Sequence, residues 1–540
     1  MFDLIIKNGA IVDGSGNVPF KADLAILDGL IHTVAPVIDR GLGQRVIEAA
    51  GFSVAPGFID IHSHSDFTLQ KNPRAESKIR QGITTEVVGN CGFTAAPVCP
   101  QRFDELMQYL VNTVTLDDEE KRHWRWPGQY SFLNDISRTG TAVNLVPLVG
   151  HGTIRVAVMG FSSRPPTAAE LRKMGLLLEK EMQEGLWGFS SGLQYDPGSF
   201  AGADELVFLG KVAARYGGIY TTHLKSEGRD LLPCLEEAVA IGRRSGVSVQ
   251  VSHLKASNPP NWGKVKAALE MIDTARTAGN NIDFDVYPYT AFGSGLIDLV
   301  PPWVRERGAR HMVAMLKNGK HRSRVLAEME LGTGDWENPM FGAAWEMVRI
   351  ASVKTEKNRG IEGKNLAQAA AARGSSPADT VLNLLVEEEG AVKIIFFAMC
   401  EQDLETLMLH PRAIFCTDGR AVAPYGELGR GKIHPRYYGT YPRILGRYVR
   451  EKKMLSLEDA VKKMTLLPAR KLNLPGRGLI AEGYHADITI FDSQEITDLS
   501  EFDDPHHFPA GIKYVIVNGV PVVTPDGHSG KLPGIILRRK

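Results

Sequence analysis

The middle of the chain alternates short apolar runs with longer segments whose apolar residues recur at helical spacing. We interpret the apolar runs that end in polar residues as eight buried strands, at Phe58–His64, Thr84–Cys91, Val143–His151, Leu186–Ser191, Gly218–His223, Val247–His253, Ile282–Tyr287 and Ala413–Asp418. Four of the intervening segments predict helices, at Thr167–Glu184, Ala203–Tyr216, Leu231–Ser245 and Lys264–Ala278. Strands that alternate with helices predict an α/β fold with a parallel sheet, and eight such strands predict a (β/α)8 barrel of the TIM type.

Both ends of the chain show a different pattern, in which short β-like runs are separated by turns. Residues 1–55 place Asp28-Gly29 between two such runs, and residues 475–540 place Asn518-Gly519 in the same position. Such dipeptides are strong indications of two-residue hairpin turns. Neither end has enough apolar residues for its own core. We therefore expect the ends to form one small β-sandwich domain beside a barrel that spans 56–474.

The connection between the seventh and eighth predicted strands, at about 288–392, is much longer than an ordinary βα unit. Long insertions at this face of a barrel often cover the active site as lids. The alternative is surface decoration or an oligomer contact, and the sequence leaves a homo-oligomer open.

Composition narrows the classes of partner. The 540 residues carry 62 lysines and arginines against 62 aspartates and glutamates, so no net charge favours nucleic acid or an anionic membrane. The start has no signal-peptide pattern, and no apolar stretch approaches the ~18 residues of a membrane span, so we expect a soluble, cytoplasmic protein with a small-molecule partner. Five widely spaced cysteines argue against a disulfide framework.

The residues that end the apolar runs suggest metal chemistry. His62 and His64 lie one residue apart in a predicted strand, so their side chains share one side. Other runs end at or beside further residues of metal-binding type, which are Cys91, His223, His253 and Asp418. Each alone has an ordinary structural explanation, such as a buried thiol or an Asp-Gly turn. Together they fall at the end of the barrel where active sites lie, and zinc accepts all these ligand types.

Six ligands are more than one ion uses, so the residues predict two sites, or one tight and one weak site. His151 also ends a run, and we expect at most a supporting or substrate-contacting role for it.

Longer motifs resemble a known family. PGFIDIHSHSD, THLKSEG, SHLK and CTDG resemble the amidohydrolase superfamily, and GNCGF, GFSSGLQYDPG, FDVYPY and HPRYYGTYPRIL resemble the N-acyl-D-amino-acid deacylases, or D-aminoacylases. The motifs recur in order through nearly the whole chain, and the resemblance is weakest at about 300–360. In this family a cysteine replaces the carbamylated lysine of hydantoinases and dihydroorotases. GFSSGLQY, at the end of the fourth strand, accordingly has no lysine.

The resemblance implies a ligand set and a mechanism. Cys91, His223 and His253 would hold a tight Zn2+, whereas His62, His64 and Asp418 would form a weaker second site that shares Cys91. Zinc would polarise the acyl carbonyl, and Asp418 would act as general base and then as general acid. The α-carboxylate would be bound by Lys255, Tyr287 and Arg430. Lys225 stands where many relatives have arginine, and its role is left open.

The preferred side chain is predicted from the segment after Tyr287. Ala291–Val304 contains no lysine or arginine but contains Leu296, Leu299 and Asp298. Relatives that select acidic D-amino acids place an arginine there, so we expect hydrophobic D-residues.

Three other functions stay open at this stage. A cyclic-amide hydrolase of the hydantoinase or dihydroorotase kind is disfavoured by the missing lysine. A deaminase is disfavoured because its chemistry does not need a shared thiolate ligand. A non-catalytic scaffold of the same fold is disfavoured by the intact ligand set. The preference for D over L substrates rests on the resemblance alone.

Overall fold

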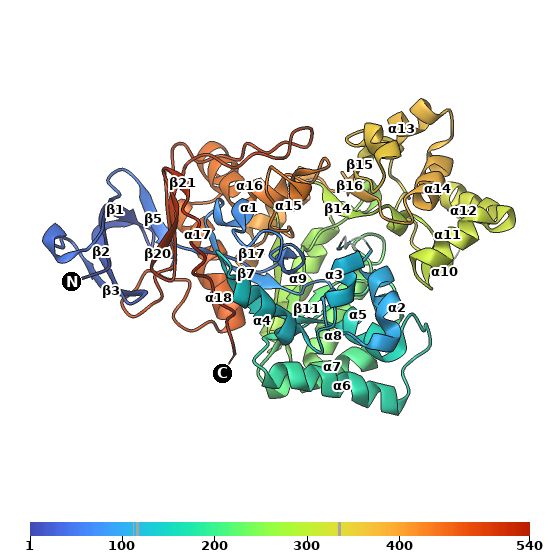
Figure 1. Cartoon of the computed structure of the whole chain (residues 1–540), viewed down its shortest axis with the longest axis horizontal. Coiled ribbons are helices and arrows are strands. Elements are labelled where there is room, and N and C mark those ends of the chain that lie inside the picture. The colour runs from blue at the N-terminus through green and yellow to red at the C-terminus, as the bar shows by residue number, and fades with distance from the viewer. Residues whose placement is uncertain (112, 115–117, 333–335, 540) are drawn as a thin grey trace.

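The computed structural model describes residues 1–111, 113–114, 118–332 and 336–539. A sheet built from both chain ends lies at one end of the molecule, and the inserted helices α10 to α14 lie at the other (Figure 1). The βα units occupy the space between them. None of the described helices has the length and apolar content needed to cross a membrane.

The two ends of the chain share one nine-stranded sheet. Its strands are β1 (Leu4–Ile11), β2 (Phe20–Leu27), β3 (Leu30–Ala35), β4 (Val46–Glu48), β5 (Ser53–Pro56), β18 (Ile488–Phe491), β19 (Ile512–Val517), β20 (Val520–Thr524) and β21 (Gly527–His528). The antiparallel pair β5–β18 joins the two ends. The predicted turns at Asp28-Gly29 and Asn518-Gly519 are confirmed, because each connects paired antiparallel strands and has positive φ at both residues.

The central strands pair in parallel in two sheets. One contains β6 (Phe58–Asp60), β7 (Ile83–Val88) and β8 (Asn144–Pro147), and the other contains β9 (Val149–Gly150), β10 (Gly188–Gly192), β11 (Ile219–His223), β12 (Ser248–Val251), β13 (Ile282–Val286) and β17 (Ala413–Phe415). Only Leu148 separates β8 from β9. The chain after β6 pairs with the chain after β17, since Ser63 and Gly419 form a parallel bridge.

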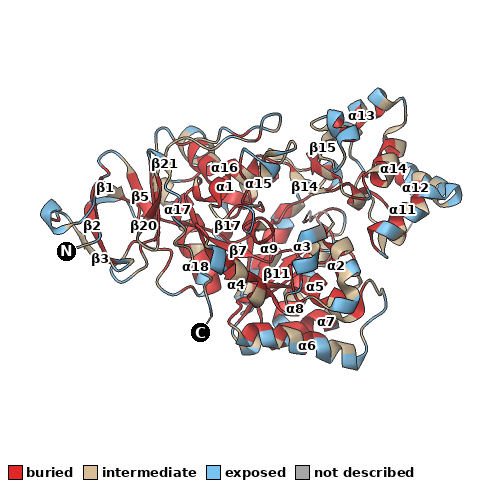
Figure 2. Cartoon of the chain, viewed as in Figure 1, coloured by how far each residue is buried: buried red, intermediate tan, exposed pale blue. Residues whose placement is uncertain are grey.

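The four predicted helices are confirmed as α6 (Ala168–Gln183), α7 (Ala203–Arg215), α8 (Leu231–Ser245) and α9 (Lys264–Thr277). Their apolar faces are buried against the strands, and their outer faces are exposed (Figure 2). The chain before them forms α1 (Glu76–Ile79), α2 (Phe103–Tyr109), α3 (Asp118–His123), α4 (Gln129–Thr139) and α5 (His151–Met159). The chain after the insertion forms α15 (Glu401–Leu409), α16 (Arg436–Arg443), a π-helix (Ile444–Glu451), α17 (Leu457–Met464) and α18 (Leu466–Leu472).

The segment between β13 and β17 has a sheet and a core of its own. Its antiparallel strands are β14 (Phe292–Gly295), β15 (Val348–Ser352) and β16 (Lys393–Phe396), with β16 in the middle. Its helices are α10 (Pro302–Arg305), α11 (Ala309–Lys317), α12 (Gly319–Leu331), α13 (Leu366–Arg373) and α14 (Pro377–Glu387). Leu296, Leu299 and Ile394 belong to the hydrophobic cluster that these elements enclose. The elements from β14 to β16 therefore enclose a core of their own beside that of the central strands.

Candidate metal centre

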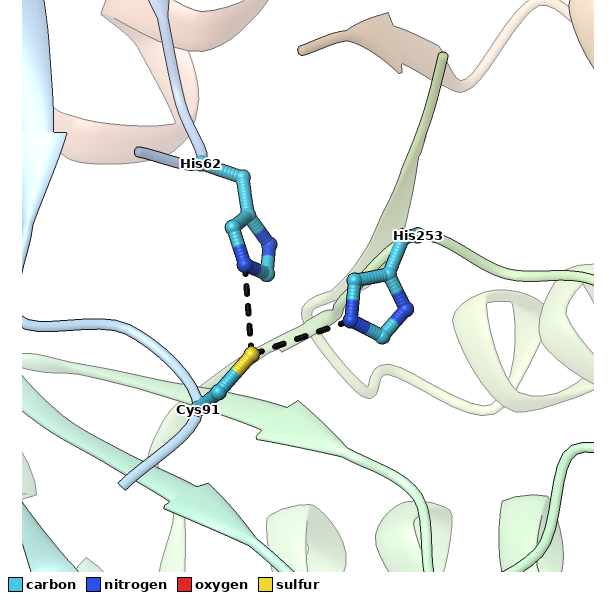
Figure 3. Close-up of side chains that lie close together, drawn as sticks. All are labelled: His62, Cys91 and His253. Atoms are coloured by element: carbon cyan, nitrogen blue, oxygen red, sulfur yellow. Dashed lines mark hydrogen bonds between the residues drawn. The ribbon is translucent and has the colours of Figure 1, made fainter. Parts of the chain in front are cut away.

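Histidine and cysteine side chains from separate strands meet just beyond the strand ends. His62 follows β6, Cys91 follows β7 and His253 follows β12. Figure 3 shows the two rings directed at the Cys91 sulfur, with His62 Nε2 at 3.3 Å and His253 Nε2 at 3.7 Å from Sγ. Residues that are far apart in the sequence thus share one buried site.

His223, the last residue of β11, completes a group of three with Cys91 and His253. Its Nδ1 lies 3.9 Å from Cys91 Sγ and 3.0 Å from His253 Nε2. Tetrahedral zinc, with bonds of about 2.3 Å to sulfur and 2.0–2.1 Å to nitrogen, separates S and N ligands by about 3.6 Å and two N ligands by about 3.3 Å. The observed separations agree with these values within roughly 0.4 Å. The three side chains therefore fit a zinc ion and leave a fourth position for water or substrate.

His62, His64 and Asp418 form a second group beside the first. Asp418 Oδ1 lies 3.5 Å from His62 Nε2 and 3.3 Å from His64 Nε2. The three ligand atoms lie within 4.8 Å of one another, which is a metal-binding arrangement. His62 also contacts Cys91, so the two groups adjoin. The structure brings all six predicted ligands together.

Three of these residues have a backbone conformation that is uncommon outside glycine. Cys91, His253 and Asp418 have φ of +53°, +33° and +44°. Such conformations cost free energy and persist where the surrounding structure enforces them, which is typical of functional sites. Each of these residues lies in the turn just after its strand, where this conformation directs the side chain to the shared centre.

The ring nitrogens that face away from the centre have polar partners. His223 Nε2 lies 2.8 Å from Gln194 Oε1, and His253 Nδ1 lies 2.9 Å from Glu227 Oε1. His62 Nδ1 lies 3.3 Å from Asp285 Oδ1. Partners of this kind fix the orientation and tautomer of metal-binding histidines. Sequence reasoning did not single out these three partners.

A buried ionic cluster lies beneath the second group. Lys78 Nζ lies 2.8 Å from Asp60 Oδ2 and 3.2 Å from Glu86 Oε2, and all three side chains are fully buried. The Thr417 hydroxyl donates to Asp60 at 2.6 Å, and Ser63 donates to Glu86. The cluster thereby links β6 and β17 next to His62 and Asp418.

The electrostatic environment favours the metal-binding forms of Cys91 and Asp418, whereas the charge on Cys91 outweighs burial and raises the pKa of His62. Burial alone would raise the pKa of Cys91, but the charge on His62 and hydrogen bonds with His223 and His253 bring that pKa well below its ordinary value. Burial would likewise raise the pKa of Asp418, but the charge on Arg436 brings it well below the ordinary range. The centre therefore contains a thiolate and a carboxylate.

The centre opens into a cavity of about 190 Å³. Predicted residues that line it are His64, Cys91, His223, His253, Lys255, Tyr287 and Asp418. Ile297 and Asp298 also line it, whereas Leu296 and Leu299 are packed in the core of the inserted segment. The two leucines on which the hydrophobic-substrate prediction rested therefore do not reach this cavity.

Only some of the residues predicted to bind the α-carboxylate line the cavity. Lys255 and Tyr287 line the cavity, but Arg430 is exposed and does not. Arg436, which is 3% exposed, lines it instead, with its Cζ 4.8 Å from the Tyr287 ring centroid. Among the described residues, Arg436 Nε and the Tyr287 hydroxyl have no hydrogen-bond partner, whereas Arg436 Nη1 lies 2.9 Å from Asp418 Oδ2 as an ion pair. Donors without partners are suited to binding a carboxylate. Arg430 and Arg436 lie close together in the sequence, so the sequence alone did not show which of the two arginines faces the cavity.

His151 lies outside this site. It is the first residue of α5 and not the end of a strand, and its Nε2 lies 2.8 Å from Glu205 Oε1 on α7. Arg155 Nη1 lies 2.5 Å from the other oxygen of Glu205. His151 is thus part of a buried structural cluster, and the suggestion of a substrate contact is not supported by its position.

Comparisons with known proteins agree with this geometry. The model of the amidohydrolase family matches residues 45–523. An N-acyl-D-glutamate deacylase from Alcaligenes xylosoxydans xylosoxydans is 34% identical over 99% of this chain and 96% of its own length. The crystal structure of an N-acyl-D-glutamate deacylase from Bordetella bronchiseptica, complexed with zinc and a phosphonate mimic of the tetrahedral intermediate, is similar with a TM-score of 0.82, 31% identity and 99% coverage of both chains. A D-aminoacylase structure that addresses a binuclear metal centre has a TM-score of 0.82 and 30% identity over the full length of both chains.

Proposed function

Because this chain belongs to the amidohydrolase family and, within it, to the N-acyl-D-amino-acid deacylases, we propose that it hydrolyses N-acyl-D-amino acids at a cysteine-containing zinc centre. The protein is a metal-dependent hydrolase of linear amides. In our proposal Cys91, His223 and His253 hold the tight zinc ion. A weaker site is formed by His62, His64 and Asp418. The ligand separations of the first group are the observation that carries the proposal.

The side chains at the centre have roles that follow from their positions. Zinc, when bound, supplies positive charge beside the amide carbonyl and makes water easier to deprotonate. Asp418 is an ionised carboxylate that lines the cavity, so it can accept the proton of the attacking water. It then gives that proton to the leaving nitrogen, and the products are a carboxylate and a free D-amino acid.

We assign the α-carboxylate of the substrate to Lys255, Tyr287 and Arg436. Lys255 Nζ lies 2.5 Å from Glu227 Oε1, which holds the lysine at the edge of the metal centre. Arg436 replaces Arg430 in this assignment, because its guanidinium is buried at the cavity and has donors to offer.

Two finer features of the fold belong to the same proposal. We interpret the eight parallel strands as a closed (β/α)8 barrel at 56–474, with β8 and β9 acting as one strand. Residues 1–55 and 475–540 form its small β domain, for which a sandwich stays a prediction. The inserted segment after β13 is proposed as one wall of the substrate site, because β14 and β16 contribute lining residues.

The preference for hydrophobic D-residues stays a prediction that now lacks the support of Leu296 and Leu299. The relatives do not decide it either, since the structures named for N-acyl-D-glutamate and for D-amino acids in general are 31% and 30% identical.

The proposed function is tested by stereospecific hydrolysis. N-acetyl-D and N-acetyl-L forms of leucine and glutamate are incubated with protein whose zinc content is measured on the same sample. We expect release of D-amino acids only, with about one or more zinc ions per chain. Zinc-loaded protein that releases neither enantiomer would contradict the proposal, and hydantoin and dihydroorotate would then be assayed as cyclic amides.

A further inference from the structure

A lysine from the inserted segment lines the wall of the cavity. Lys393 is the first residue of β16, where it pairs with Gly295 of β14, and it is half-buried. The other lysine of the cavity, Lys255, is paired with Glu227. Lys393 lies about 90 residues beyond Ala291–Val304, the segment on which the sequence prediction of the preferred side chain rests.

The cationic side chains that line the cavity differ in whether a carboxylate of the protein is paired with them. Arg305 Nη1 lies 3.1 Å from Asp196 Oδ2, and Arg436 Nη1 lies 2.9 Å from Asp418 Oδ2. Within the part of the chain that the structure describes, Lys393 Nζ has no hydrogen bond and no ion pair. A half-buried ammonium group is stable when an anion accompanies it, so the cavity has a position that suits an anionic ligand group.

A second cation strengthens this position. Arg420 lines the same cavity and donates a 2.6 Å hydrogen bond to the Thr113 carbonyl. The charge on Arg420, together with burial, lowers the pKa of Lys393 to about 7. Two neighbouring cations repel each other, and a bound anion would relieve that repulsion for both.

Asp298 is the carboxylate that led the sequence analysis to expect repulsion of an acidic substrate. In the structure this carboxylate already has hydrogen-bond partners. Asp298 accepts hydrogen bonds from the Ser294 hydroxyl and from the Gly295 backbone N–H, and it lies near Arg305. The hydrogen bonds and the charge of Arg305 partly offset the charge of the Asp298 carboxylate, so its repulsion of an anion at Lys393 is weakened.

We propose that Lys393, supported by Arg420, binds a second carboxylate of the substrate, carried either by the side chain of the D-residue or by the acyl group. The inference rests on the proposed function, in which Lys255, Tyr287 and Arg436 take the α-carboxylate. It makes Lys393 a specificity-determining residue that favours dicarboxylate substrates. The hydrophobic preference is replaced if the side chain of the D-residue carries the second carboxylate.

Two matched pairs of substrates test the proposal and locate the carboxylate. N-acetyl-D-glutamate is compared with its neutral isostere N-acetyl-D-glutamine, and N-succinyl-D-leucine with N-acetyl-D-leucine. Kinetics are measured on zinc-loaded wild type, Lys393→Met and Lys393→Arg. Lys364→Met serves as the control, because Lys364 is an exposed lysine of the same inserted segment.

We expect the wild type to prefer the dicarboxylate member of one pair by about 10- to 100-fold in kcat/KM. Lys393→Met should remove that preference mainly by raising KM, because the contact is the same in the bound substrate and in the transition state. Lys393→Arg should retain most of it. Lys364→Met should retain all of it and should leave the kinetics on the neutral substrates unchanged.

The pair that shows the preference identifies the source of the carboxylate. Activity on all four substrates without a preference in either pair would overturn the inference and leave the proposed function intact. A preference that survives in Lys393→Met would also overturn it. A zinc-loaded wild type that hydrolyses none of the four would overturn the proposed function and the inference together.

Discussion

Replacing Arg436 by methionine tests the carboxylate site at its most buried residue. Methionine retains an unbranched apolar side chain but removes the charge and every donor. Arg436 Nε lacks a hydrogen-bond partner among the described residues and is available to a substrate carboxylate, whereas Nη1 is paired with Asp418. The variant therefore removes a charged contact that Lys255 and Tyr287 cannot replace.

The size of the effect follows from the one donor that has no partner. A hydrogen bond to a charged group contributes about 1.5–3 kcal/mol. With a tenfold change for each 1.4 kcal/mol or so, kcat/KM should fall by about 10- to 100-fold. Arg436 Nη1 also lies 2.9 Å from Asp418 Oδ2, so part of the loss should appear in kcat through a less well-oriented Asp418.

The assay compares Arg436→Met with Arg430→Met on an N-acyl-D-amino acid and on its α-carboxamide analogue. Arg430 is exposed, so Arg430→Met should stay within about twofold of the wild type. The penalty of Arg436→Met should be large for the acid and small for the carboxamide, which has no α-carboxylate. Zinc content and thermal unfolding are measured on each variant to separate binding from misfolding.

The reasoning is refuted if Arg430→Met loses about 100-fold while Arg436→Met is nearly unchanged. That result would mean that the exposed loop carrying Arg430 moves onto the substrate, as the sequence prediction requires. An equal penalty for acid and carboxamide would show that Arg436 acts on Asp418 alone.

Three further predictions concern the base, the buried ionic cluster and pH. Asp418→Asn should abolish turnover. Elemental analysis should still find about one zinc ion per chain, bound at Cys91, His223 and His253. Retained turnover would exclude Asp418 as the base. Lys78→Met should destabilise the protein by about 3–5 kcal/mol, because Asp60 and Glu86 are left buried without their cation. The apparent Tm, measured at a fixed scan rate, should fall by several degrees. An unchanged Tm would contradict this prediction. The charge on Arg420 and burial lower the pKa of Lys393 to about 7, so the lysine is charged below that pH and neutral above it. In the substrate pair that shows the preference, the ratio of kcat/KM for the dicarboxylate to that for its neutral partner should therefore fall as the pH rises from about 6 to 9. A flat ratio in that pair would show that Lys393 does not bind the second carboxylate, because groups that act on both substrates cancel in the ratio.

The sequence was most informative where the structure is periodic. Buried strands, amphipathic helices and Asp-Gly or Asn-Gly turns leave local patterns, so their positions were predictable within a few residues. The ligand set was predictable for the same reason, because each ligand lies at the end of an apolar run. His151 shows the limit of that argument, since a run can also end at the first residue of a helix.

Contacts between segments that are far apart in the sequence leave no periodic pattern in it, so they could not be predicted in this way. Ile297 and Asp298 line the cavity while the adjacent Leu296 and Leu299 face a separate core, a distinction made by one short 3-10 helix. Whether Arg430 or Arg436 reaches the substrate depends on the path of the loop after Asp418, which the sequence does not encode in any periodicity.

The cavity lies between two parts of the chain that have separate hydrophobic clusters, so its chemistry and its selectivity can vary separately. The ligands follow the central strands, and buried partners such as Asp285 and Glu227 fix them in place. Lys393 instead belongs to a sheet whose neighbours Ile394 and Phe396 pack in the core of the inserted segment. A substitution on β16 can therefore change which substrate is accepted without disturbing the separations on which metal binding depends. Selectivity among these deacylases is accordingly better sought in the side chains that the inserted segment presents to the cavity than in the metal-binding motifs.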